Sequence, residues 1–236
     1  MKYALYALCI LIDCSPCLSQ PVCRSTDYRK HELQADPPLA QAIASIEAFT
    51  ANTLKNRPVI VTGGNAGSPP SLITIPVVVH IVYQTDAENI SDAQVQSQIT
   101  VLNTDYQKQN PDTVEIPSYY RSLAANCAFR FGLAQLDTNG QATTGIVRRQ
   151  TNVAAFTIDD GIKSTASGGD DGWDRDRYLN IWVGNLTGGI LGYSSIIGGP
   201  KATDGVVCCI RRLAPTALRP LLSISDIQRS MKLGTG

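Results

Sequence analysis

Apolar residues run almost without interruption from residue 77 to 82, a pattern typical of a strand that is covered on both faces. His80 lies inside this run, where a histidine is more often a hydrogen-bonded core residue than a metal ligand. A helix is predicted next, because Ser91 and Gln94 have the spacing of a capping box. Its apolar face repeats at three- and four-residue steps: Val95, Ile99, Leu102 and Tyr106.

Shorter patterns predict two further strands downstream of this helix. Apolar and polar residues alternate from 129 to 135, and residues 145–151 form another candidate strand with Arg148 and Arg149 on a solvated face. The order strand, helix, strand predicts a parallel pair of strands joined by a right-handed crossover.

The most informative stretch runs from residue 178 to 207. Residues 178–183 are rich in strand-forming side chains, and after Gly188 and Gly189 residues 190–193 are predicted to return alongside them as a short strand. A second glycine turn precedes residues 204–207, which start another strand. The chain is therefore predicted to have an α/β fold, with a twisted mixed β-sheet and packed helices.

A separate N-terminal unit is predicted ahead of this sheet. Residues 36–54 read as a helix, with Asp36 as its cap, Pro37 in the first position, and an apolar face. A linker rich in Gly, Pro and Ser follows at 63–70. This pattern favours a removable prosegment over residues 20–71, with Arg57 as a candidate cleavage point; a packed N-terminal extension is the alternative.

The first 19 residues are predicted to be a secretory signal peptide. Lys2 supplies a positive start, and residues 4–12 are apolar but too few to span a bilayer, which needs about 20 residues. A buried first helix and a lipoprotein anchor at Cys14 are the weaker alternatives. We therefore expect a secreted, extracellular protein.

Composition and charge exclude other classes of partner. The 236 residues are 43% hydrophobic and 17% charged, enough to bury a sizeable core. Twenty basic and twenty acidic residues cancel, so no nucleic-acid or membrane partner is expected. Residues 167–176 are rich in oxygen ligands but lack the spacing of a calcium loop, which favours a structural loop anchored by Trp173.

Of the seven cysteines, two remain once those of the signal and of the C-terminal tail are set aside. These are Cys23 and Cys127, and the sequence does not show whether they form a disulfide. Cys127 precedes a predicted strand and is expected to pack as a small apolar residue.

Several ordered motifs between residues 72 and 207 resemble pappalysin-type metzincin metalloproteases. They are the strand IPVVVHIVY at 75–83, the helix from Ser91, the Trp173-Asp174 pair, LNIWV at 179–183, LGY at 191–193 and DGVV at 204–207. The resemblance implies the fold of the N-terminal half of a metzincin catalytic domain. It also implies a protein or peptide substrate, and zinc as the cofactor of the full-length form.

Two sites follow from the resemblance alone. In that family an antiparallel edge strand pairs with extended substrate, and the matching residues here are Leu191, Gly192 and Tyr193. Some members are kept latent by a prosegment cysteine that binds zinc, a role that would fall to Cys23. A disordered or disulfide-bonded Cys23 is the alternative.

The family's zinc signature, HExxHxxGxxH, does not occur in this sequence. The first two histidines of this signature bind zinc one helical turn apart, and the glutamate between them polarises the attacking water. The chain has only His31 and His80, and neither belongs to such a motif. The sequence as printed is therefore expected to supply no catalytic residue and no zinc ligand, and to be inactive.

The residues from 208 to 236 are interpreted as an out-of-frame tail. In the codons for Ser230 to Gly236, the last base of the Met231 codon and the first two of the Lys232 codon spell Glu. The neighbouring shifted codons permit His-Glu-Ile-Gly-His-Trp, the opening of the zinc motif, a coincidence of roughly one in a thousand.

Two functions are compatible with these patterns. The first is a secreted zinc metalloendopeptidase whose reading frame is interrupted. The second is a short, non-catalytic secreted protein that binds extended peptides through its edge strand.

Overall fold

The computed structural model describes residues 22–56 and 72–210. Within them, seven strands form one sheet in the order β1-β6-β7-β5-β2-β3, with β4 also paired to β2. The strands are β1 (Val22–Cys23), β2 (Ile73–Tyr83), β3 (Phe129–Leu133), β4 (Ile146–Gln150), β5 (Leu179–Gly184), β6 (Ile190–Ser194) and β7 (Val206–Cys209). The predicted α/β fold with a mixed sheet is confirmed.

Strand β2 is the centre of the sheet, as its apolar run predicts. It pairs in parallel with β5 on one side and with β3 and β4, one after the other, on its opposite side. Residues Val77 and Val78 are fully buried, so both faces of the strand are covered.

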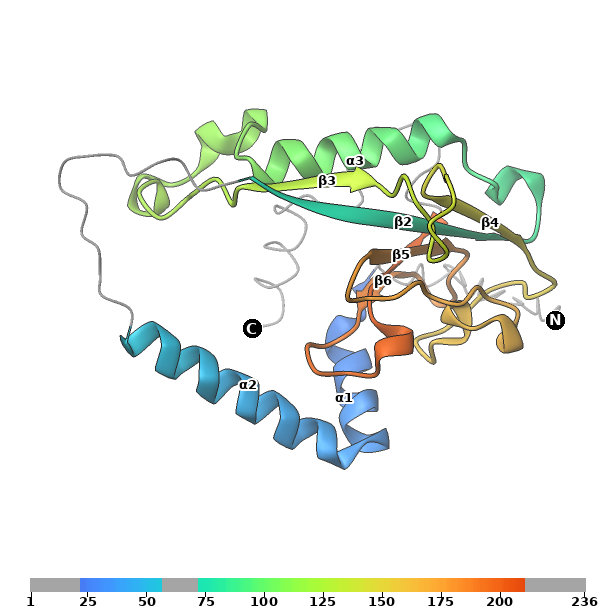
Figure 1. Cartoon of the computed structure of the whole chain (residues 1–236), viewed down its shortest axis with the longest axis horizontal. Coiled ribbons are helices and arrows are strands. Elements are labelled where there is room, and N and C mark those ends of the chain that lie inside the picture. Colours follow the sequence, from blue (N-terminus) through green and yellow to red (C-terminus); the bar gives the residue numbers. More distant parts are fainter. Residues whose placement is uncertain (1–21, 57–71, 211–236) are drawn as a thin grey trace, which may run out of the picture.

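Helix α3 (Asp92–Tyr106) makes the crossover from β2 to β3 (Figure 1). The predicted capping box is present: the backbone N–H of Gln94 donates to Ser91 Oγ, and the backbone N–H of Ser91 donates to Gln94 Oε1. The apolar face of the helix packs on the sheet through Val95 and Ile99. Short 3-10 helices join other elements: η1 (Asp86–Glu88), η2 (Pro111–Glu115), η3 (Ser118–Tyr120), η4 (Gly161–Lys163), η5 (Thr165–Ser167) and η6 (Lys201–Thr203).

The prediction that β6 returns alongside β5 is wrong. Strand β7 lies between them, parallel to β5 and antiparallel to β6. The reason is burial: Val207, Cys208 and Cys209 are all buried, so β7 suits the interior of the sheet better than β6 does. Strand β7 also continues two residues past Val207, where the predicted sheet domain ends.

The N-terminal unit holds two helices rather than one, α1 (Ser25–Ala35) and α2 (Pro37–Asn56). The predicted helix over 36–54 corresponds to α2, which begins at Pro37, and α1 was not predicted. Only Leu39 of the predicted apolar face is buried, whereas Phe49 is 72% exposed. Figure 1 shows α1 beside the β6 end of the sheet and α2 extending away from it. Within the described ranges, the search for a helix with the length and hydropathy of a membrane span found none.

One further prediction about a side chain is wrong, and another is confirmed. Cys127 is exposed and free instead of packed, because the stretch of irregular backbone at 124–128, before β3, lies largely at the surface. Arg148 and Arg149 are exposed, as predicted. The Arg148 guanidinium also donates to the Asn89 side chain at 2.5 Å and to the Ile90 carbonyl at 2.7 Å, and it pairs with Asp92. Arg148 therefore links β4 to the loop between β2 and α3. The predicted signal peptide, the linker at 63–70 and the tail from residue 211 lie outside the described residues.

Candidate functional site: an edge strand covered by the N-terminal segment

Strand β6, which carries Leu191, Gly192 and Tyr193, is covered on its outer edge by β1. Cys23 of β1 is paired in parallel with Gly192, and the Arg24 amide donates to the Gly192 carbonyl at 3.0 Å. The Ser194 amide, two residues on, donates to Ser25 Oγ at 3.3 Å. The N-terminal segment therefore uses the hydrogen-bonding groups that an added peptide strand would need.

Because Gly192 has no side chain, β6 can lie close to the backbone of β7. A Cβ atom built at this position would be 2.4 Å from the Val207 carbonyl oxygen, well inside van der Waals contact. The sequence motif LGY thus has a steric reason for its glycine. Tyr193 is buried, whereas Leu191 is only partly so.

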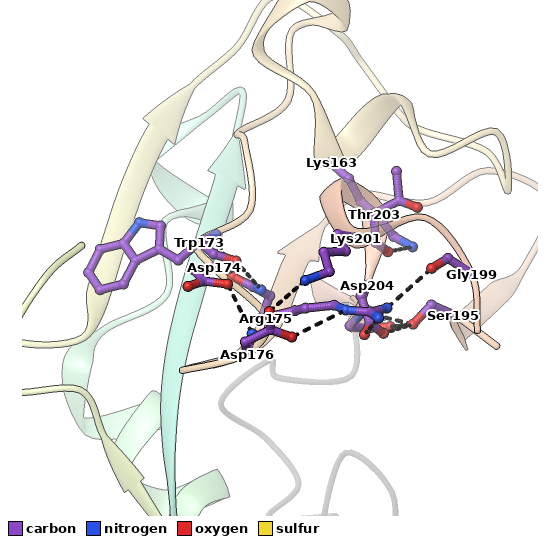
Figure 2. Close-up of polar contacts among 12 residues, drawn as sticks. Lys163, Trp173, Asp174, Arg175, Asp176, Ser195, Gly199, Lys201, Thr203 and Asp204 are labelled. Carbon is purple, nitrogen blue, oxygen red and sulfur yellow. Dashed lines mark hydrogen bonds and ion pairs between the residues drawn. The ribbon is translucent and has the colours of Figure 1, made fainter. Parts of the chain in front are cut away.

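The turn from β6 to β7 is held by a polar network around Asp204, drawn in Figure 2. Asp204 accepts from Ser195 Oγ at 2.5 Å and from Arg175 Nη1 at 3.1 Å. Arg175 also donates to the Gly199 carbonyl at 3.1 Å, inside the same turn. Because these bonds cross the turn and its neighbouring loop, they fix where β6 lies relative to β7.

A second set of bonds joins the same turn to the acidic loop before β5. Lys201 pairs with Asp176 at 2.6 Å. Trp173 anchors the loop through its backbone, whose N–H donates to Asn180 Oδ1 at 2.8 Å. The observed contacts are those of a structural loop.

His80 is a fully buried core histidine. Its Nδ1 lies 2.6 Å from Asp170 Oδ2, and its Nε2 lies 3.1 Å from Asn180 Oδ1. The ring stacks on Trp182 with centroids 5.1 Å apart. Both ring nitrogens are therefore engaged inside the protein.

The described residues do not fit a zinc site. Neither residues 22–56 nor 72–210 contain a group of three His, Cys, Asp or Glu side chains that could hold a metal ion. His80 has both nitrogens occupied, and His31 lies largely exposed on α1 beside Glu32. No step through zinc can be derived from these side chains.

Cys23 is an exposed free thiol on the strand that covers β6. Its Sγ lies 3.4 Å from Ser25 Oγ. Its position beside Gly192 brings together two residues that the sequence analysis singled out separately.

One functional cluster was missed by sequence reasoning. Tyr28 of α1 is buried against Tyr193, with ring centroids 4.9 Å apart, and its hydroxyl donates to Asp160 Oδ2 at 2.6 Å. The ammonium of Lys163 lies 2.8 Å from Asp160 Oδ1. Nothing in the sequence pairs these residues, since Tyr28 and Asp160 are 132 positions apart.

Electrostatics in this cluster follow from burial. Burial, and then the Asp160 carboxylate, raise the pKa of Tyr28 and of Tyr193, so both phenols stay neutral. Burial lowers the pKa of Lys163, while the Asp160 carboxylate acts in the opposite direction.

The structures to which this chain is similar are metzincin-type metalloproteases. Three of them are structures of mirolysin. Mirolysin in complex with compound 9 is 44% identical with a TM-score of 0.59, over 62% of this chain and 56% of that chain. Mature mirolysin of Tannerella forsythia with a cleaved peptide is 43% identical with a TM-score of 0.60, over 63% and 57%. A promirolysin mutant of T. forsythia is 36% identical with a TM-score of 0.67, over 84% and 62%.

The chain thus spans a little over half the length of the structures it matches. No family model and no curated protein sequence matches it. These similarities support a metalloprotease relative of metzincin type, as the sequence motifs imply.

Proposed function

We propose that this chain is the N-terminal part of a secreted, zinc-dependent metalloendopeptidase of the pappalysin type. Identity of 43% to a mirolysin that holds a cleaved peptide supports the peptidase assignment. In the full-length form, zinc-activated water would hydrolyse a peptide bond of a protein or peptide substrate. The ligands and the general base would come from residues other than those described here.

The observation that carries the proposal is the pairing of β1 with β6. An edge strand that already accepts a backbone strand, through Gly192 and Ser194, has the geometry to bind an extended peptide. We assign Leu191, Gly192 and Tyr193 to substrate binding. Main-chain bonds at this edge would tolerate many substrate sequences.

The N-terminal segment is proposed to be a prosegment spanning residues 20–71. The promirolysin structure aligns with 84% of this chain, against 62% and 63% for the other two mirolysin structures. The additional part of this chain that the promirolysin structure covers is about the size of the proposed prosegment, as expected if that segment has a counterpart only in the pro form. With β1 on β6, the segment would exclude substrate until it is removed, and Cys23 is proposed to add latency in the full-length form.

Residues 208–236 are proposed to be out of frame, beginning inside β7. The shifted reading His-Glu-Ile-Gly-His-Trp at residues 230–236 supports it. The test is to sequence the coding DNA from the codon of Asp204 to well past that of Gly236.

A one-base correction that opens His-Glu-x-x-His, followed by expression and chelator-sensitive cleavage of peptides, is the expected result. A reading frame that matches the printed residues throughout would remove the zinc peptidase proposal. A non-catalytic protein that binds extended peptides through β6 would then be the better assignment.

A further inference from the structure

Side chains from three parts of the sheet domain surround Tyr28 beside β6, and the space they enclose is called the pocket below. Asp160 directly precedes the 3-10 helix η4 and Lys163 ends it, while Trp182 lies on β5 and Tyr193 on β6. The side chain of Lys163 is completely buried, and its ammonium donates to the Thr203 carbonyl at 2.7 Å as well as pairing with Asp160 (Figure 2 shows Lys163 and Thr203).

The pocket is filled by one residue of the N-terminal segment, Tyr28. Its ring is 1% exposed and faces three partners. The ring lies against Tyr193, the Lys163 ammonium is 4.9 Å from the ring centroid, and the hydroxyl donates to Asp160 at 2.6 Å. Stacking, a cation–π contact and a charge-assisted hydrogen bond therefore meet on a single phenol.

Lys163 has partners in the sheet domain that are independent of Tyr28. Lys163 is held by Asp160 and Thr203, and its ammonium also faces the rings of Tyr193 at 5.1 Å and Trp182 at 5.6 Å. None of these partners belongs to the N-terminal segment. Without Tyr28, the remaining residues would still present a carboxylate acceptor and a cation to an aromatic ring.

We propose that this pocket is a binding subsite for the side chain of a tyrosine in a peptide that lies along β6, and that Tyr28 occupies it as an internal ligand. The inference rests on the proposed function, in which the N-terminal segment leaves and a peptide takes its place. In the N-terminal segment the backbone of Cys23 pairs with Gly192, and Tyr28, five residues later in helix α1, reaches the pocket. Phenylalanine fits the ring but leaves Asp160 without its hydroxyl donor, so tyrosine is preferred.

The test is occupancy of the vacated pocket by a small probe in the full chain. Tyr28→Ala removes the internal ligand, and p-cresol reproduces the lost side chain, whereas toluene lacks the hydroxyl. We expect p-cresol to bind Tyr28→Ala about tenfold or more tightly than toluene does, as ligand-observed NMR would measure, because a hydrogen bond to a carboxylate is added. The unsubstituted chain should bind neither, since Tyr28 fills the site.

The matched control is Tyr28→Ala combined with Asp160→Asn, which should bring the p-cresol and toluene affinities close together. Equal affinity of the two probes for Tyr28→Ala, or p-cresol binding to the unsubstituted chain, would overturn the proposal. N-acetyl-tyrosinamide should then compete with p-cresol more strongly than N-acetyl-phenylalaninamide. None of these measurements needs zinc or hydrolysis, so their failure is separate from failure of the peptidase assignment.

A second measurement applies if Tyr28→Ala does not fold. Tyr28→Phe keeps the ring and removes only the hydroxyl, and a double-mutant cycle with Asp160→Asn isolates the coupling between the two groups. We expect the unfolding constant to show a coupling of about fivefold or more. Additive effects would mean that the carboxylate does not recognise the phenol, and would overturn the proposal.

Discussion

His80 and Asp170 form a pair in which His80 Nδ1 lies 2.6 Å from Asp170 Oδ2, although 90 residues separate them in the chain. The other ring nitrogen faces Asn180 Oδ1. The amide of Asn180 has a defined orientation, because its Nδ2 donates to the Trp173 carbonyl and its Oδ1 accepts from the Trp173 N–H. Both ring nitrogens of His80 therefore face acceptors, and the ring joins β2, β5 and the acidic loop.

Replacing His80 with leucine should destabilise the fold substantially. The change removes the ring nitrogen that faces the Asp170 carboxylate oxygen and leaves Asn180 Oδ1 with the Trp173 N–H alone, so the free energy of unfolding should fall by about 2–4 kcal/mol. Urea denaturation measures this. The control is His31→Leu, whose side chain is largely exposed on α1, with an expected change within about 0.5 kcal/mol. Similar effects of the two substitutions would show that the buried hydrogen bonds contribute nothing.

Replacing Gly192 with alanine should disturb the β6–β7 pairing. The new Cβ would lie 2.4 Å from the Val207 carbonyl oxygen, and relieving this overlap should cost about 1–3 kcal/mol of stability. Gly132→Ala in β3 is the matched control, since a Cβ there meets no atom within 4 Å. Amide hydrogen exchange should show faster exchange in β6 and β7 only in the Gly192 variant. Unchanged protection of these strands would contradict the steric role of this glycine.

The cysteines should differ sharply in their reactivity toward alkylating reagents. Cys23 and Cys127 are exposed, whereas burial raises the pKa of Cys208 to about 12 and keeps it as the unreactive thiol at pH 8. Iodoacetamide followed by mass spectrometry should modify Cys23 and Cys127 first and Cys208 only in denaturant. Early labelling of Cys208 in the native chain would mean that β7 does not hold its place in the sheet.

Asp171 should contribute to stability in a pH-dependent way. Its carboxylate accepts from the Thr165 amide at 2.9 Å and the Thr165 hydroxyl at 2.8 Å, which lowers the pKa of Asp171 in the folded chain. A lowered folded-state pKa means that the stabilisation is present above the unfolded value near 3.9 and is lost as pH falls through the folded value.

Asp171→Asn should therefore reduce the loss of stability between pH 7 and pH 3, as urea midpoints at the two values would measure. Glu47→Gln serves as the control, because Glu47 lies exposed on α2. An unchanged difference between the two pH values in Asp171→Asn would exclude these hydrogen bonds as its source.

The sequence by itself determined the elements whose signals are local. The uninterrupted apolar run identified β2, the capping box placed the start of α3, and alternation identified β3. The same residues carried the motif resemblance, because a short strand keeps its side-chain pattern wherever it lies in the sheet. Proline at the first position likewise marked the start of α2.

Only the tertiary structure decided which strands are neighbours and which distant side chains meet. Strand β7 enters between β5 and β6 because its side chains are buried, a property set by the rest of the sheet and not by its own four residues. The contact of Tyr28 with Asp160 depends on α1 packing against β6, across a separation of 132 residues. Local periodicity records which face of an element is apolar, but it does not record the partner against which that face is buried.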